Sequence, residues 1–140
     1  MNLTANEIFR IVWDWIQQSP LYEAIPTMYA DHFPTAHKGR SQRGEFMVIT
    51  SLANATGDLQ VATVLVNIYV PDQTPSFADA KEQRYPNRNR LAELTRIAFD
   101  SLKGYPNDER WFFDVSDETL LSEEVIPYSF SSIKVKLKKY

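Results

Sequence analysis

The chain of 140 residues is 44% hydrophobic and 13% aromatic, contains no cysteine, and carries a formal net charge of −3. This length and composition predict one folded domain, residues 1–140, and the absence of cysteine excludes a disulfide framework, a thiolate nucleophile and a cysteine-based metal site. The negative charge argues against a general nucleic-acid-binding protein, and the lack of any run of about 18 apolar residues argues against a membrane partner.

The first predicted element is an amphipathic helix over residues 5–18. Thr4 and Glu7 have the spacing of a capping box, in which each side chain binds the backbone N–H of the other residue. Ser19-Pro20 then ends the helix or begins a new turn. The residues of its apolar stripe recur at helical spacing: Ile8, Ile11, Val12, Trp15 and Ile16.

Residues 26–44 are predicted to be an extended segment or a loop, and they hold the one basic cluster of the sequence: His37, Lys38, Arg40 and Arg43. Two interpretations stay open, a solvated loop or a contact with DNA or an acidic partner, and four charges would support only weak, salt-sensitive binding. His32 and His37 are five residues apart in a Pro/Gly-containing segment, which does not predict a metal site.

A long β-hairpin is predicted next. The segment FMVITSL (46–52) and the segment from Leu59 to Val70 are apolar runs joined by a short polar turn. Twelve strand residues span about 40 Å, as much as the diameter of a compact domain of this size. Alternate residues of the second strand should form the core: Ala62, Val64, Val66, Ile68 and Val70. The opposite face is mixed, and it is either solvated or a subunit interface.

The remaining elements are a helix and two strands. The helix starts near Asn87 or Asn89, has an i,i+4 pair of Arg96 and Asp100, and ends at Gly104, which suits a left-handed C-cap. A short strand is expected at 111–115, followed by a solvated acidic stretch up to Glu124, and the C-terminal SSIKVKLKKY alternates as a half-exposed strand. The order predicts an α+β fold, with a mainly antiparallel sheet and two helices packed on one face.

No residue is predicted to be catalytic, and no cofactor is expected. The sequence lacks a nucleophile elbow, a dinucleotide-binding glycine motif and a phosphate-binding loop. The carboxylates of residues 114–124 lie in a polar segment that offers nothing to raise a pKa.

Several segments together resemble the tail-completion proteins of long-tailed phages and prophages, the group of tail terminators and head-to-tail joining proteins. These are SPLYEAI, the run EFMVITSLANATGDLQVATVLVNIYVPD, RLAELTRIAFDSLKG and the Lys-alternating end. The most telling part is Glu45 to Asp72, with VITSL, GDLQ and VNIYVPD.

The resemblance implies a non-enzymatic subunit, without a cofactor, of a hexameric ring that terminates the tail tube or joins it to the head. Such a protein is assembled in the bacterial host cytoplasm and resides in the virion, where its partners are copies of itself, tail-tube proteins and head–tail connector proteins, with at most transient passage of DNA. The implied subunit interface is the mixed strand face: Val61, Thr63, Leu65, Asn67 and Tyr69. The implied hairpin tip is Asn54, Thr56, Gly57 and Asp58, and the implied channel-facing or DNA-facing residues are Lys38, Arg40 and Arg43.

Two alternatives remain. A small α+β ligand-binding or enzymatic domain would need a concave apolar pocket with convergent polar groups. A nucleic-acid-binding module would use the basic loop at 37–43.

Overall fold

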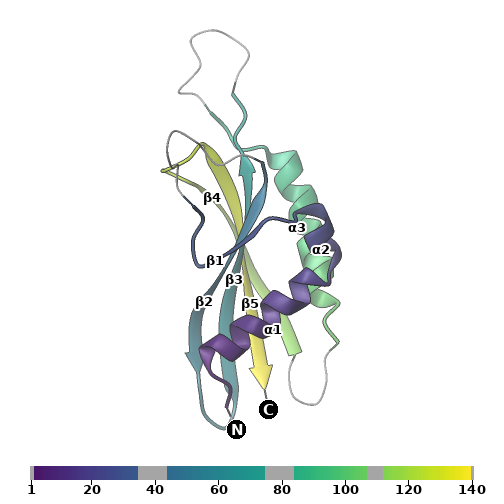
Figure 1. Ribbon diagram of the computed structural model, residues 1–140, viewed down its shortest axis with the longest axis vertical. Coiled ribbons are helices and arrows are strands. Elements are labelled where there is room, and N and C mark those ends of the chain that lie inside the picture. Colours follow the sequence, from purple (N-terminus) through teal and green to yellow (C-terminus); the bar gives the residue numbers. More distant parts are fainter. Residues whose placement is uncertain (1, 35–43, 75–83, 107–111, 140) are drawn as a thin grey trace.

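The computed structural model describes residues 2–34, 44–74, 84–106 and 112–139. Three helices lie on one face of a five-stranded sheet (Figure 1), whose strand order is β1-β2-β3-β5-β4. All neighbouring strands are antiparallel except β1, which is parallel to β2. This confirms the predicted α+β class. The elements are α1 (Ala5–Gln17), α2 (Pro20–Ala24), β1 (Met28–Ala30), β2 (Phe46–Ala55), β3 (Gln60–Pro71), α3 (Arg88–Lys103), β4 (Phe112–Ser122) and β5 (Tyr128–Lys139).

Helix α1 begins as its sequence predicts. Thr4 N donates to Glu7 Oε1 at 3.0 Å, and Glu7 N donates to Thr4 Oγ1 at 3.2 Å, so the capping box is complete. The helix ends at Gln17, and Pro20 takes the first position of the short helix α2, where its missing N–H costs nothing. Trp15 Nε1 donates to Ser101 O at 2.8 Å, which ties α1 to α3.

The long strand β3 is the centre of the sheet. It pairs along its length with β5 on one side and with β2 on the other. A central strand is paired on both sides, so the twelve residues of β3 are supported by the equally long β5 and the nearly as long β2. Its predicted core residues, Ala62, Val64, Val66, Ile68 and Val70, all belong to the main hydrophobic core.

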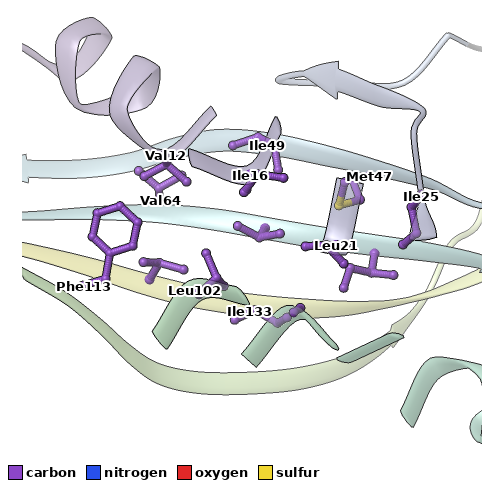
Figure 2. Close-up of a cluster of buried hydrophobic side chains, with 14 of the residues drawn as sticks. Val12, Ile16, Leu21, Ile25, Met47, Ile49, Val64, Leu102, Phe113 and Ile133 are labelled. Carbon is purple, nitrogen blue, oxygen red and sulfur yellow. The ribbon is translucent and has the colours of Figure 1, made fainter. Parts of the chain in front are cut away.

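The main core fills the space between the helices and the sheet (Figure 2). Side chains from every layer meet there, including Val12 of α1, Leu21 of α2, Val64 of β3, Leu102 of α3 and Ile133 of β5. Complete burial of one such side chain stabilises the fold by about 1.5–3 kcal/mol relative to an exposed position. The core therefore fixes which face of the sheet is left for other uses.

Three predictions about the C-terminal half were wrong. Gly104 caps α3 with φ −75°, a right-handed value, so its lack of a Cβ is not used for a left-handed turn. The strand does not stop at 115: β4 runs on to Ser122 with a bulge between Val115 and Asp117, so Asp117 and Glu118 belong to it, while they are exposed as expected and Glu123 and Glu124 follow the strand. A polar segment can form this strand because lysines of β5 lie opposite its aspartates. The expected Arg96–Asp100 ion pair is also absent from the described part of the chain.

Candidate functional site

The outer face of the sheet, opposite the helices, divides into a covered half and an open half. In the covered half the rings of Phe46, Tyr69 and Phe130 stack across three neighbouring strands, with centroids 4.6 Å and 4.5 Å apart. Phe33 closes over this row, with ring centroids 5.4 Å from Phe46 and 5.3 Å from Tyr69. Ile126, from the turn between β4 and β5, is buried in the same cluster. The chain thus covers half of its own outer face.

Tyr69 is enclosed by this aromatic cluster and is only 5% exposed. Its hydroxyl donates to Glu123 Oε2 across 3.5 Å. Burial, reinforced by the negative charge of Glu123, raises the pKa of the Tyr69 hydroxyl well above its usual value of 10.0. The ring of Tyr69 therefore packs within its own chain rather than presenting a free surface to a neighbour.

The open half lies toward the hairpin turn, the end of the molecule where both termini also lie (Figure 1). Val61 and Leu65 are half-buried here, and the tightly packed Thr63 lies between them on the same face. The register places a lysine beside each of the three on β5: Lys138, Lys136 and Lys134. The result is an apolar row next to a basic row.

Aspartates of β4 balance part of this basic row. Lys138 Nζ lies 3.2 Å from Asp114 Oδ2, and Lys134 Nζ lies 3.9 Å from Asp117 Oδ2. Lys136, in the middle of the row, makes no ion pair among the residues with described positions. The open half therefore holds a cation that is ready for a carboxylate from outside the chain.

Asn67 lies at the boundary between the two halves, flanked in register by Val48 and Ser132. Its Oδ1 is buried and has no hydrogen-bond partner in the described structure. A buried polar group left unpaired costs about 1–3 kcal/mol. Asn67 is on the predicted outer face, as its parity requires, but it is poorly satisfied there.

The hairpin turn is anchored at its base instead of projecting freely from the sheet. Thr56, Gly57 and Asp58 lie in the turn between β2 and β3, with Gly57 at φ 146°, where a Cβ would be strained. Asn54 belongs instead to β2, and its Nδ2 donates to Leu3 O at 3.2 Å. Buried Gln60 bonds both to Leu3 and to Asn54. The base of the turn is thus held by the segment that leads into α1.

Lys38, Arg40 and Arg43 lie outside the described residues, as does His37. His32 is exposed beside β1. Among the residues that are described, no group of three His, Cys, Asp or Glu side chains is placed to hold a metal ion. No helix in those same segments is long and apolar enough to cross a membrane.

A groove on the helix side lies between α3 and β4, with a volume of about 420 Å³. Sequence patterns did not indicate it. Glu118 is its one carboxylate, and that side chain accepts a hydrogen bond from Ser131 Oγ at 2.8 Å. The lining includes no histidine and no second carboxylate, so it offers no acid–base pair for catalysis.

The sequence was compared with known proteins. No protein-family model matches the chain. No curated protein matches it either. The basis for a functional assignment is therefore the surface of the chain itself, together with the resemblance in its segments.

Proposed function

We propose that this chain is a non-enzymatic structural protein of a phage or prophage virion, whose copies form a ring that terminates the tail tube or joins the tail to the head. The observation that carries the proposal is the open half of the outer sheet face. Glu45 to Asp72, the part with the most telling resemblance, contains β2 and β3, so the resemblance falls on the hairpin that builds this face.

The chemistry of the open half suits a protein partner. Val61 and Leu65 supply apolar contact area, and the unpaired Lys136 beside them supplies a charge that can select a partner carboxylate. One contact would thus cover the apolar row and pair the free lysine.

In the proposed ring, the tail-tube proteins, the connector proteins and the DNA would each contact a different part of the assembly. Tail-tube and connector proteins would bind its two rims, and DNA would pass through its centre without strong attachment. An overall charge of −3 favours such passage, because a strongly basic channel would retain DNA. In this arrangement Lys38, Arg40 and Arg43 are proposed to face the channel.

The test is assembly of the purified chain, measured by light scattering after size exclusion and by electron microscopy. Leu65→Asp should reduce ring formation, because it puts a carboxylate into the apolar row. Asn6→Asp adds the same charge at an exposed position of α1 and should assemble normally. The Leu65 side chain is partly exposed, so circular dichroism should show that both variants fold. Equal assembly of both variants would remove the open half from the interface, and a wild-type chain without rings, alone or with tail-tube protein, would contradict the function.

A further inference from the structure

The groove between α3 and β4 exists because the sheet lacks large side chains beneath the first half of α3. On the helix-facing side, β4 carries Glu118 where an apolar residue would close the gap, and β5 carries the small buried residues Ser129 and Ser131. Leu91 and Phe99 of α3 and Leu120 of β4 line the resulting space. The groove is thus an apolar hollow at the edge of the core.

Polar groups around this hollow favour an anion. Arg88 and Arg96 both line it, and neither forms an ion pair within the described segments. Two arginines against Glu118 alone leave one positive charge unbalanced. Thr95, also in the lining, has a hydroxyl without a partner in the described structure, but its oxygen is enclosed, so the arginines alone supply the attraction. The groove therefore suits an apolar side chain with a carboxylate next to it.

The turn between β4 and β5 presents that combination. Val125 is 65% exposed, the most exposed large apolar side chain of the described residues, and it follows the exposed Glu124. We name residues 123–127 the acidic turn. Glu124 makes no ion pair in the described chain, so its carboxylate is available to another molecule.

The acidic turn is held in one shape. Glu123 Oε1 accepts from Glu124 N at 3.0 Å and from Val125 N at 3.3 Å. Arg84 Nη2 donates to Glu123 O at 2.8 Å, while Ile126 is buried in the aromatic cluster. Val125 is thus exposed by a fixed backbone, and docking it would cost little conformational entropy.

We propose that the acidic turn of one copy docks in the α3–β4 groove of a second copy, with Val125 among the apolar lining residues and Glu124 beside the arginines. The turn between β4 and β5 and the start of α3 lie toward the same end of the molecule (Figure 1), but the turn packs on the outer sheet face and α3 packs on the other. A contact between different surfaces of identical chains is head-to-tail, and such contacts close into rings or extend into filaments. The contact rests on the proposed function only for ring closure, because docking itself needs just two copies.

Charge exchange between two variants tests this pairing. Arg96→Glu and Glu124→Arg should each weaken self-association by about tenfold or more, because each puts like charges together. An equimolar mixture of the two should recover association, since each groove then finds a turn of opposite charge. Arg10→Glu, a reversal at an exposed site on α1, is the matched control and should leave association unchanged.

The measurement is sedimentation velocity over a dilution series of the full chain, with circular dichroism as the check on folding. Val125→Asn is a second variant, which should weaken association without altering the charge. A wild-type chain that stays monomeric throughout, or a mixture no better than its separate components, overturns the docking. Rings that form regardless of both reversals also overturn it but leave the proposed function intact. Association that follows the charge exchange and yields only dimers or open chains retains the docking and counts against the ring.

Discussion

Gln60 should contribute more to the free energy of unfolding than a solvent-exposed polar side chain does. The residue is 1% exposed at the start of β3. Its Oε1 accepts from Leu3 N at 3.0 Å, and its Nε2 donates to Leu3 O at 2.8 Å and to Asn54 Oδ1 at 2.7 Å. One amide thereby joins the segment before α1, the end of β2 and the start of β3.

Gln60→Ala removes all three hydrogen bonds. At about 1 kcal/mol each, and with some of the stranded groups able to reach water, the expected loss in the free energy of unfolding is about 3 kcal/mol. For a domain of this size that loss corresponds to a fall in Tm of about 10 °C. Urea unfolding followed by tryptophan fluorescence measures it directly, because Trp13 and Trp15 lie in α1.

Two further variants separate the hydrogen bonds from other effects. Thr56→Ala changes the nearby exposed turn and should cost less than about 0.5 kcal/mol, as surface substitutions do. Gln60→Glu keeps the acceptor for Leu3 N but loses both donors and faces Leu3 O and Asn54 Oδ1 with a carboxylate. It should cost at least as much as Gln60→Ala at neutral pH. A loss for Gln60→Ala no greater than that for Thr56→Ala would refute this account of the hairpin base.

Two more predictions concern the outer sheet face. Burial and Glu123 raise the pKa of Tyr69, so its neutral hydroxyl stabilises the fold below the unfolded value of 10.0, and this contribution is lost as the pH rises through the higher folded value. Tyr69→Phe should therefore flatten the fall of the urea midpoint above about pH 10, and an unchanged slope would exclude the role. Asn67→Val removes a buried carbonyl without a partner and should raise the free energy of unfolding by about 1 kcal/mol. A loss of stability would mean that the amide is already satisfied.

The sequence predicted the elements whose evidence is local. The Thr4–Glu7 spacing set the start of α1, and alternation along β3 and β5 assigned Val64 and Ile133 to the core. It did not predict β1, whose three residues are stabilised by pairing with β2 rather than by their own pattern. The strand predicted at 111–115 was shorter than β4, because acidic residues disfavour a strand until lysines from another strand lie opposite them.

The surface was harder to predict for a related reason. Parity placed Tyr69 on the outer face, but nothing near it in the sequence indicates that Phe33 and Ile126 would cover it. The groove is another long-range product, since its space depends on Ser131 and Glu118 while its arginines come from α3. Helical spacing would group Arg88, Thr95 and Phe99 on neighbouring positions, yet it gives no sign that the sheet beneath them is hollow.

The open half of the outer face and the acidic turn lie toward opposite ends of the sheet, so a ring that used both would hold each subunit at both ends. The open half lies toward the hairpin turn, the acidic turn joins the opposite ends of β4 and β5, and the groove lies between these levels on the helix side, where Glu118 of β4 is in register with Ile133 of β5. A subunit held by its neighbours at only one of these ends could pivot, whereas contacts at both would fix its tilt. Once one contact has formed, the second becomes intramolecular and gains from a high effective concentration. Leu65→Asp and Arg96→Glu should then each weaken the ring moderately, and the combined variant should abolish it.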